Sequence, residues 1–362
     1  MNHAHLDLLL RGAAKTRSIL SFAGGLPAPE TFPRRAIAAA AEDAILEMGT
    51  GPLQYDWPEG RKPLRDLIAA DLRRRGAEVE AADVLITNGA QDAIAIAVDV
   101  LAPRSICVDA LTYPGALELF RSRGCDVRTE AAEVRYAMPA IANPTGEAAT
   151  AEAREQMLGA RWVLEDDAYA DLDYSGEDPA PPLIAAARDR VFHIGTFSKT
   201  LLPGLRVGWL VPPRSWLRRV RETKLRRDLH ASGLAQAIVE RFLVREHFPE
   251  RLQALRRLYR RRSEAMTIAL ASVPRLRFRA PRGGFSVWVE SELHADETRW
   301  LQRALAEGIA FDPGSLFMVR EEPGAPLAMR LSYSTISEDR IPDGVARLGR
   351  ALDRERSARP AA

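Results

Sequence analysis

Short apolar runs alternate with helix-length segments through the first two thirds of the chain. Continuous apolar runs of this length, separated by helices, are typical of a parallel sheet that is covered on both faces. The pattern predicts strands at 84–87, 105–110, 162–166, 191–197 and 206–211, and helices at 90–101 and 114–123. Ligands of such sheets bind at the carboxyl ends of the strands, so we expect the chemistry of this protein there.

One interval breaks the alternation. The apolar runs at 126–130 and 136–140 are separated by only a few residues. A crossover between parallel strands usually needs a dozen residues or more, often as a helix. We therefore expect one of these two runs to be coil or an antiparallel strand.

A different pattern begins at residue 214. The segment 214–272 is rich in arginine and has apolar positions three and four residues apart, which predicts amphipathic helices. Arginines in such a segment could bind nucleic acid, but a solvated helix face is the simpler interpretation. Mixed strand and helix patterns follow and predict a smaller α+β lobe, with strands at 276–279, 283–290 and 329–334 and helices near 297–307 and 338–353.

These patterns predict an α/β protein with two domains. At 362 residues the chain exceeds the usual size of one hydrophobic core. We expect a large domain at 45–265, with a mostly parallel sheet covered by helices, and a small α+β domain formed by 1–44 and 266–362.

Composition and charge exclude several classes of partner. The chain has 51 basic and 49 acidic residues, and its net charge of +2 gives no electrostatic reason to bind nucleic acid or an anionic membrane. The most apolar stretch, 93–102, is about half as long as a membrane span and contains Asp99. The N-terminus lacks the pattern of a signal peptide, so we expect a cytoplasmic protein.

Lysine is scarce. Only Lys15, Lys62, Lys199 and Lys224 are lysine among the 51 basic residues, so each lysine is a candidate for a task that arginine cannot perform, such as forming an imine with an aldehyde. Lys199 lies just beyond a predicted strand, in GTFSKTLLPGLRVGW. Thr196, Ser198 and Arg206 flank it, and these hydroxyls and this guanidinium suit a phosphate whose carrier is attached to Lys199.

Three further motifs follow predicted strands. EDDAYADL, at 165–172, offers three carboxylates, but no histidine lies nearby to complete a metal site, so we predict no metal. A carboxylate there would instead keep a pyridine nitrogen protonated. ANPTGE, at 142–147, is typical of a turn, from which the Asn143 amide can donate to a ring oxygen. TNGAQDA, at 87–93, is either a plain strand-to-helix connection or a helix start with N–H groups free for a phosphate.

The order of these motifs carries a resemblance. Nine motifs occur in sequence between Ser21 and Ser334, namely SFAGGLPAPETFP, LQYDWPEG, ITNGAQDA, LTYPGA, NPTG, EDDAY, GTFSKTLLPGLRVGW, PRGGFSVW and MRLSYS. In this order they resemble the fold-type-I pyridoxal-phosphate aminotransferases of class I/II. The chain is most similar to the aminoadipate, kynurenine and related broad-specificity transaminases, which share the GGLPAPE and LQY stretches.

The resemblance implies a pyridoxal 5′-phosphate cofactor and assigns residues to it. Lys199 matches the lysine that forms the imine with the cofactor and then moves the substrate proton. Asp166 matches the partner of the pyridine nitrogen, and Tyr113 the aromatic ring stacked on the cofactor. The donors to the ring hydroxyl oxygen match Asn143 and Tyr169. The phosphate-binding set matches Ala90 and Gln91 by backbone and Thr196 and Arg206 by side chain.

The resemblance also implies substrates and a partner subunit. Arg330 matches the arginine that binds the substrate α-carboxylate through a bidentate fork, and Gly25 a backbone contact near it. Asn143 is expected to contact the substrate as well as the cofactor. The substrates would be an amino acid and a 2-oxo acid, with 2-oxoglutarate the expected acceptor. Tyr55 matches a tyrosine that reaches the phosphate of the other subunit, so the expected assembly is a homodimer with shared active sites.

Several positions depart from the family pattern. Ala90 stands where relatives often have serine, and Ala142 where glutamine often precedes the asparagine. The interval from Tyr113 to Asn143 is short, because relatives have a further helix there. These departures bear on the substrate more than on the class of reaction.

Two other functions stay open. One is another pyridoxal-phosphate reaction on the same fold, as in a lyase, decarboxylase or racemase. The other is the effector-binding module of a transcription regulator, although we expect the short segment before Ser21 to leave no room for a DNA-binding domain. The pattern does not name the amino acid; in the N-terminal segment Arg11, Lys15 and Arg17 are candidate contacts for an acidic side chain, or solvent-exposed cations.

Overall fold

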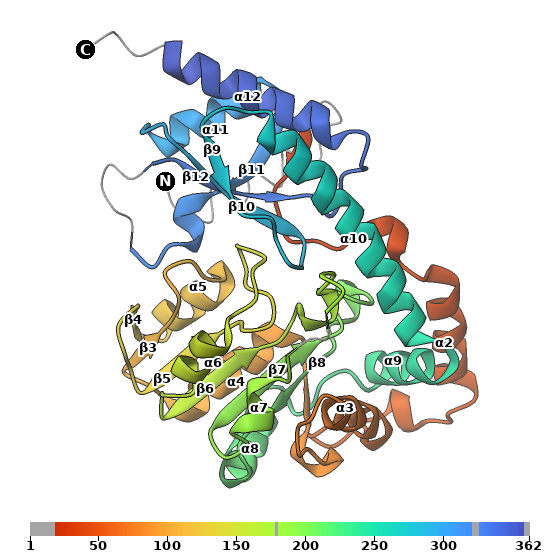
Figure 1. Cartoon of the computed structure of the whole chain (residues 1–362). Coiled ribbons are helices and arrows are strands. Elements are labelled where there is room, and N and C mark those ends of the chain that lie inside the picture. Colours follow the sequence, from red (N-terminus) through yellow and green to blue (C-terminus); the bar gives the residue numbers. More distant parts are fainter. Residues whose placement is uncertain (1–18, 178–179, 321–325, 358–362) are drawn as a thin grey trace.

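The computed structural model describes residues 19–177, 180–320 and 326–357. Its strands form two separate sheets, one of seven strands and one of five. Figure 1 shows the larger sheet in the lower part of the molecule and the smaller sheet above it, with the long helix α10 (Phe248–Ala271) passing from one part to the other. The candidate residues of the N-terminal segment, Arg11, Lys15 and Arg17, lie outside the described residues.

The larger sheet has the order β2-β8-β7-β6-β5-β3-β4. All neighbouring strands are parallel except that β8 is antiparallel to both β2 and β7. The expected α/β class with a mostly parallel sheet is therefore confirmed. The strands are β2 (Leu85–Thr87), β3 (Ser105–Cys107), β4 (Asp126–Arg128), β5 (Val134–Ala137), β6 (Trp162–Asp166), β7 (Val191–Thr196) and β8 (Gly208–Val211).

The prediction for the interval 126–140 is wrong. Both runs contain a parallel strand: β4 lies at the edge of the sheet, and β5 lies on the other side of β3. Arg128 and Arg135 are both register partners of Cys107. Between β4 and β5 the chain therefore crosses β3 and shifts little along the strand direction. The thiol of Cys107 donates to the carbonyl of Thr129 in the connection. The connection of five residues, 129–133, is long enough because β4 and β5 have only three and four residues. The chain therefore has little distance to run back before β5 begins.

The strand β8 is the antiparallel member of this mostly parallel sheet. The segment between β7 and β8 holds only residues 197–207, too few for a helical crossover to a parallel neighbour. The chain therefore turns back, and Thr196 becomes the register partner of Gly208. This turn holds Lys199 at the carboxyl end of β7.

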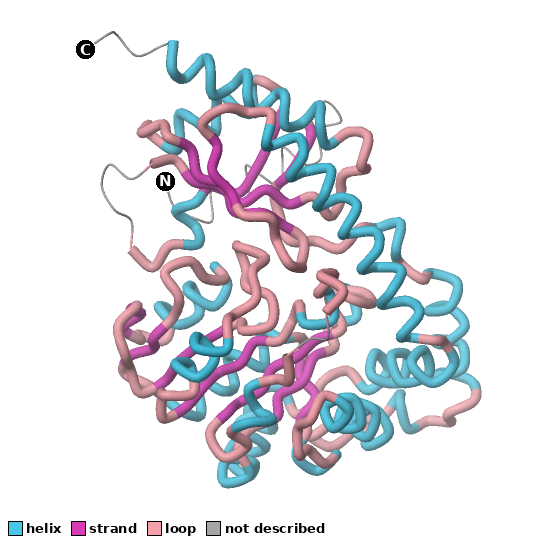
Figure 2. The backbone as a smooth tube through the Cα atoms, in the orientation of Figure 1, coloured by secondary structure: helices cyan, strands magenta, loops and turns pink. Residues whose placement is uncertain are grey.

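Both faces of the larger sheet are buried. Successive residues of β6 alternate between two core clusters, with Val163 in one and Leu164 in the other, as the pleat of a strand requires. The cluster of Leu164 is covered by α4 (Ala90–Leu101), α5 (Pro114–Ser122), α8 (Leu217–Asp228) and α10. The cluster of Val163 is covered by α2 (Arg34–Leu46), α3 (Lys62–Arg74), α6 (Ala151–Met157), α7 (Leu183–Ala186) and α9 (Gly233–Arg245). Figure 2 shows this layering of helices around strands.

The smaller sheet joins both ends of the described chain. Its order is β1-β11-β12-β10-β9, and β1 pairs in parallel with β11 although nearly 290 residues separate them. Neither β1 nor β11 was expected from the sequence. Helices α11 (Glu297–Ala306) and α12 (Ile341–Ser357) contribute to the core of this part. The strands are β1 (Leu20–Phe22), β9 (Leu276–Phe278), β10 (Ser286–Ser291), β11 (Ile309–Pro313) and β12 (Ala328–Ser332).

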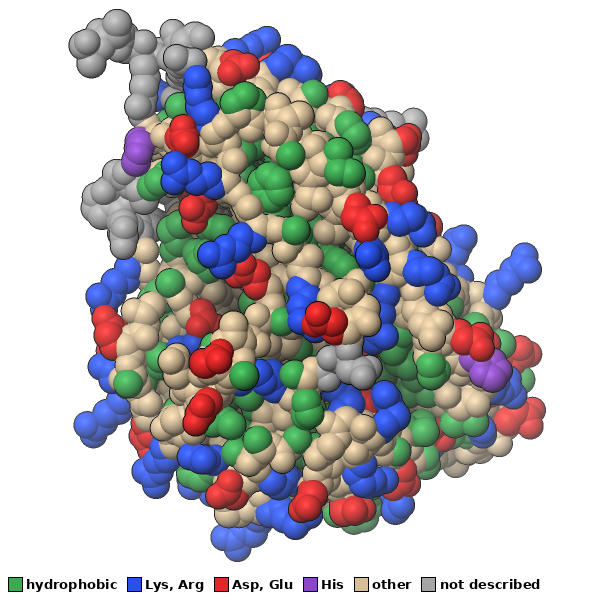
Figure 3. Space-filling model, viewed as in Figure 1, with side chains coloured by type: hydrophobic (Ala, Val, Ile, Leu, Met, Phe, Trp, Pro, Cys, Tyr) green, Lys and Arg blue, Asp and Glu red, His purple; other side chains and the backbone are tan. Residues whose placement is uncertain are grey.

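The surface agrees with the nearly balanced charge. Figure 3 shows basic and acidic side chains interspersed over the face in view. Among the described residues, no helix combines the length and apolar character needed to cross a membrane. The division into domains at 45–265 and at 1–44 with 266–362 stays a prediction; α10 continues across its boundary at 265.

Candidate active site

Asp166 ends β6 at the carboxyl edge of the larger sheet and is buried. Its Oδ2 accepts a hydrogen bond from the hydroxyl of Tyr136 at 2.7 Å, and its Oδ1 accepts one from the backbone N–H of Ala168 at 3.2 Å. Burial raises the pKa of Asp166, because it outweighs these two hydrogen bonds and the nearby charge of Lys199, which all lower it. The site therefore contains a fixed, buried acceptor that a cationic partner would keep ionised.

Lys199 lies close to Asp166 and is contacted by both parts of the molecule. Its Nζ donates to the carbonyl of Gly25 at 2.8 Å, and it lies 5.3 Å from the ring centroid of Tyr169 and 5.9 Å from that of Phe285. Gly25 and Phe285 adjoin strands of the smaller sheet, whereas Lys199 and Tyr169 follow strands of the larger one. The amine is thus held where the two sheets face each other.

Arg206 lies against the start of α4. Its Nη2 donates to the carbonyl of Asn88 at 3.0 Å. Gly89 has a positive φ of 83°, and a Cβ there would lie 2.6 Å from Nη2 of Arg206. A Cβ on Gly208 would lie 2.9 Å from the backbone nitrogen of Ala90. Gly89 thus lets the guanidinium of Arg206 approach the start of α4, and Gly208 lets β8 approach it. The guanidinium beside the free N–H groups of the helix start makes a cradle for an anion.

Hydroxyl and amide groups lie on neighbouring segments. Thr196 Oγ1 donates to Ser198 Oγ at 2.9 Å and accepts from the backbone N–H of Ser198 at 3.1 Å. The side chain of Gln91 donates to the carbonyl of Gly115 at 2.8 Å, while its Oε1 is buried without a partner among the described residues. The helix start at Ala90 and Gln91 is therefore tied to the start of α5.

Arg330 lies in the middle of the smaller sheet and is oriented by an acidic partner. Its Nε and Nη2 both donate to Oδ2 of Asp312, at 3.0 and 2.6 Å, and its Nη1 donates to Oδ1 of Asn143 at 2.9 Å. Asp312 is its register partner on β11. The ring of Phe317 lies 4.7 Å from the guanidinium carbon. The carboxylate of Asp312 thus holds the Nε–Nη2 edge of the guanidinium in place, while Nη1 points to Asn143, which follows a strand of the larger sheet.

Gly25 and Tyr113 lie among these groups. A Cβ on Gly25 would lie 3.2 Å from the hydroxyl of Tyr169 and 3.6 Å from Nη1 of Arg330, so a side chain there would enter the space between them. Burial raises the pKa of Tyr113 to about 12, and the charges of Asp166 and Arg330 both act on its phenol. These two residues show that the carboxylate, the arginine and the tyrosines surround one space.

The structure brings most of the expected residues together. The set that converges on this space consists of Gly25, Ala90, Gln91, Tyr113, Asn143, Asp166, Tyr169, Thr196, Lys199, Arg206 and Arg330. Tyr55 is apart from them: its side chain is 79% exposed, and its ring meets the edge of His230 at 5.8 Å between centroids.

Sequence reasoning missed the residues that support this set. Tyr136 and Asp312 bind Asp166 and Arg330, but each lies in a strand whose place in the sheet the sequence pattern did not give. Asp167 points away from the site and pairs with Arg75 at 2.6 Å. The three adjacent acidic residues of EDDAY were a signal, since three buried carboxylates need separate partners.

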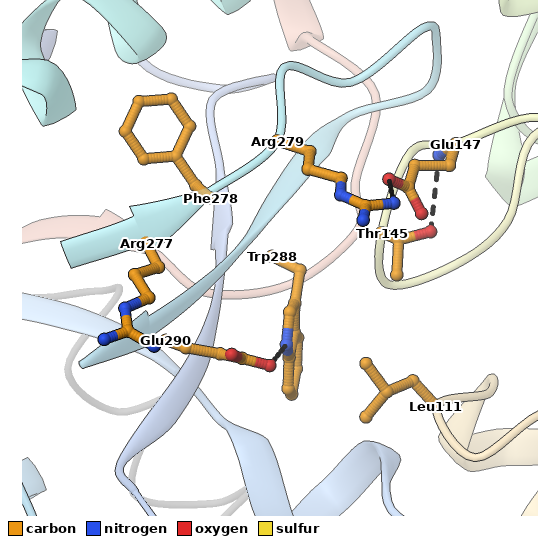
Figure 4. Close-up of a pocket in the computed structure, with 8 residues that line it drawn as sticks. All are labelled: Leu111, Thr145, Glu147, Arg277, Phe278, Arg279, Trp288 and Glu290. Carbon is orange, nitrogen blue, oxygen red and sulfur yellow. Dashed lines mark hydrogen bonds and ion pairs between the residues drawn. The ribbon is translucent and has the colours of Figure 1, made fainter. Parts of the chain in front are cut away.

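A cavity of about 370 Å³ lies between the two parts of the molecule, next to the Asn143 loop (Figure 4). Thr145 and Glu147 line it from the larger part, and Trp288 and Arg279 from the smaller one. Arg279 and Glu147 form an ion pair at 3.3 Å across the gap. Trp288 is the register partner of Arg330, so this cavity adjoins the strand that carries the candidate carboxylate-binding arginine.

Comparison with known proteins identifies the class. The sequence profile of the family "Aminotransferase class I and II" matches residues 137–348, which is more than half of the chain. The chain belongs to the class I and II aminotransferases. It is 37% identical to a 2-aminoadipate transaminase from Thermus thermophilus, over 92% of this chain and 90% of that protein.

Solved structures agree with this assignment. LysN, an α-aminoadipate aminotransferase from Thermus thermophilus crystallised with N-(5′-phosphopyridoxyl)-L-leucine, superposes with a TM-score of 0.85 at 34% identity, covering 99% of this chain and 100% of LysN. The kynurenine aminotransferase of Pyrococcus horikoshii superposes with a TM-score of 0.89 at 27% identity, covering 98% of this chain and 95% of that enzyme. The protein is therefore an amino-acid aminotransferase of fold type I that uses pyridoxal phosphate.

The described residues fit that cofactor. Lys199 offers an amine beside the buried Asp166, and the cradle at Arg206 and the start of α4 offers donors to a phosphate. The space that a Cβ on Gly25 would fill lies between Tyr169 and Arg330. An amine, a buried carboxylate and an anion cradle are the partners that an aldehyde, a pyridine nitrogen and a phosphate require.

Proposed function

We propose that this aminotransferase transfers the amino group of an L-amino acid to 2-oxoglutarate, with Lys199, Asp166, Tyr113 and Arg330 as its principal active-site residues. The observation that carries the proposal is the convergence of Lys199 and Arg330 from the two sheets on one space lined by Asn143 and Tyr169. The reaction needs an amine to bind the cofactor and a fork to bind the substrate carboxylate.

Lys199 is the residue that would move the proton. Bound pyridoxal phosphate supplies an aldehyde for the amine and a ring that accepts the electron pair released at Cα. Nζ of Lys199 would then take the proton from Cα of the substrate and hold it for the second half of the transfer. Its contact with the carbonyl of Gly25 holds the amine beside the space where Cα would lie.

Asp166 would hold the pyridine nitrogen in its protonated form. Its charge is stabilised by Tyr136 and by the N–H of Ala168, while burial keeps water away and strengthens its attraction for a cation. Asn143 and Tyr169 would donate to the ring oxygen, and Tyr113 would stack on the ring.

The phosphate-binding role belongs to the other end of the site. Ala90, Gln91, Thr196 and Arg206 would hold the phosphate through the cradle described above. Fixing the phosphate fixes the position of the ring relative to Lys199.

Arg330 would bind the substrate α-carboxylate, beside the backbone of Gly25. Asp312 occupies one edge of the guanidinium, so the fork is already oriented before substrate arrives. The free energy of binding between Arg330 and the substrate carboxylate would then orient Cα–H, because the Arg330 side chain is already ordered. Because Arg330 lies in the smaller sheet and Lys199 follows a strand of the larger one, one substrate would contact both parts and favour closure with exclusion of water.

We further propose a homodimer in which Tyr55 completes the site of the partner subunit. Leu53, Tyr55 and Trp57 form an exposed apolar segment, with side chains 55%, 79% and 77% exposed. Exposed apolar groups gathered in this way commonly mark an interface between subunits. Among the described residues, the hydroxyl of Tyr55 makes no hydrogen bond, and its ring contacts only the edge of His230.

A panel of amino donors with 2-oxoglutarate tests the proposal. 2-Aminoadipate, kynurenine, leucine and aspartate are incubated with the holoenzyme, and glutamate formation is measured. We expect at least one L-amino acid to give saturable turnover, and Lys199→Ala to give none. Release of carbon dioxide or racemisation of the donor without glutamate formation would favour another pyridoxal-phosphate reaction.

A further inference from the structure

A cavity of about 530 Å³ lies in the large part of the molecule, away from the residues assigned to the cofactor, and is lined in part by α3, α9 and α10. Figure 1 shows where these three helices lie. Its lining combines an apolar wall with charged groups at one side. The charged lining residues are Asp71, Arg74, Arg75, Asp171 and Arg256, and the aromatic ones are Phe197, Trp209 and Phe248.

The apolar wall is built around Phe197. Its ring centroid lies 5.1 Å from that of Trp209 and 6.3 Å from that of Phe248. Leu243 and Leu252 extend this wall. Three packed rings with aliphatic neighbours make a surface suited to an apolar or aromatic side chain.

On the charged side of the cavity, Arg256 and Asp171 each have polar side-chain atoms without a hydrogen-bond partner among the described residues. Nε of Arg256 donates to the backbone carbonyl of Asp171 at 2.7 Å, and within the described residues its two Nη groups have no hydrogen-bond partner. Among the described residues, the carboxylate of Asp171 makes no hydrogen bond and no ion pair. Burial, and then the charge of Asp71, raise the pKa of Asp171 to about 6, as expected for a carboxylate with too few cationic partners.

The other charged groups are already paired. Arg75 donates to the buried Asp167, and Arg74 to Asp71. The cavity therefore presents one available anion and one available cation side by side, joined through the Arg256–Asp171 contact. A ligand that carries both charges on adjacent atoms satisfies both groups, whereas a ligand of a single charge leaves one of them unpaired.

We propose that this cavity is a second amino-acid site, separate from the active site, which binds an L-α-amino acid with an apolar or aromatic side chain. The ammonium group pairs with Asp171, the carboxylate with the Nη groups of Arg256, and the side chain packs on Phe197 and Trp209. Two lining residues of the cavity are close in sequence to residues of the proposed active site. Phe197 lies two residues before Lys199, and Asp171 lies two residues after Tyr169.

Calorimetry with L-phenylalanine tests the site. The holoenzyme is used in its pyridoxamine form, in which an added amino acid is not transaminated. It carries Arg330→Gln, which removes the proposed carboxylate contact of the active site. We expect saturable binding of L-phenylalanine to this protein. Adding Arg256→Gln is expected to weaken it at least about tenfold, the loss typical of one charge-assisted hydrogen bond.

Two further variants make the result decisive. Asp171→Asn preserves shape and removes the charge, and it should weaken binding as Arg256→Gln does. Arg257→Gln is the matched control, because Arg257 lies on the same helix but does not line the cavity; it should leave the affinity unchanged. Absence of saturable binding to the Arg330→Gln protein, or equal affinity in the Arg256→Gln and Arg257→Gln proteins, would overturn the proposal.

Discussion

At the scale of single residues, the site depends on two adjacent aspartates that point in opposite directions. Asp166 accepts from Tyr136 on the side of the candidate active site, whereas Asp167 forms an ion pair with Arg75 and lies 3.9 Å from Nε2 of His193. Successive residues at a strand end face opposite sides of the sheet. One of these carboxylates is therefore available for chemistry, and the other neutralises a buried cation.

This division predicts different consequences for two substitutions of equal size. Asp166→Asn should keep the fold and lower kcat by about three orders of magnitude, which corresponds to roughly 4 kcal/mol of transition-state stabilisation. Asp167→Asn should lower the free energy of unfolding by about 3 kcal/mol, because it leaves the buried Arg75 without its counter-ion. Thermal unfolding and kcat are measured on both proteins. If Asp167→Asn abolished turnover without loss of stability, the two assignments would be exchanged.

Asp171 gives a pH-dependent prediction. Its pKa of about 6 in the folded protein lies above the ordinary value near 3.8, so the folded state binds this proton more tightly than the unfolded chain. The carboxyl therefore costs no stability below about pH 4, and its cost grows as the pH rises to about 6, towards an upper limit of roughly 3 kcal/mol. Asp171→Asn should raise Tm at pH 8 and have little effect at pH 4. An equal effect on Tm at both pH values would contradict the assignment.

At the scale of elements, the apolar pattern predicted which segments are strands better than how the strands pair. The runs that became β2, β6 and β7 were found because each is apolar and bounded by turn residues. The direction of β8 and the neighbours of β4 depend on contacts between distant segments, which a local pattern does not contain. The strand β1 has only three residues and is defined by its pairing with β11.

The same distinction separates the site residues that were found from those that were missed. Lys199, Asp166 and Asn143 lie in motifs with local signals, such as a rare lysine or a strand-end carboxylate. Asp312 had no such signal, because its partnership with Arg330 exists only through the pairing of β11 with β12.

The strand β12 carries a prediction about substrate orientation. Arg330→Lys keeps the positive charge but loses the bidentate fork and the contact of both Nε and Nη2 with Asp312. We expect kcat/KM for the amino donor to fall by roughly two to four orders of magnitude through misorientation of Cα–H. The dissociation constant of the cofactor should hardly change, since Arg206 and the start of α4 are intact. Loss of cofactor with unchanged amino-acid kinetics would show that the roles of the two arginines are exchanged.

At the scale of the whole molecule, the active site depends on contacts that join separate parts. The carbonyl of Gly25, next to β1, accepts from Lys199, and Arg330 on β12 donates to Asn143. These contacts join the two parts of the molecule directly at the candidate active site. The smaller sheet fixes β1, and the segment after β1 offers a backbone acceptor to Lys199. The relative position of the two parts therefore affects the position of the Lys199 amine.

The proposed dimer extends this dependence to a second chain and gives the last prediction. Tyr55→Phe should lower activity about tenfold by removing a hydrogen bond to the phosphate of the partner subunit, and Lys199→Ala should be inactive. In a hybrid of the two variants, one site carries both defects and the other is native. After equal amounts exchange subunits, half of the dimers are hybrids, so activity should rise about fivefold above that of the two proteins assayed without exchange. Subunit exchange is followed with an affinity tag on one variant, and activity is measured on the purified hybrid. A hybrid with no more activity than half that of the Tyr55→Phe protein would show that each chain completes its own site, because Tyr55 would then act only on the lysine of its own subunit.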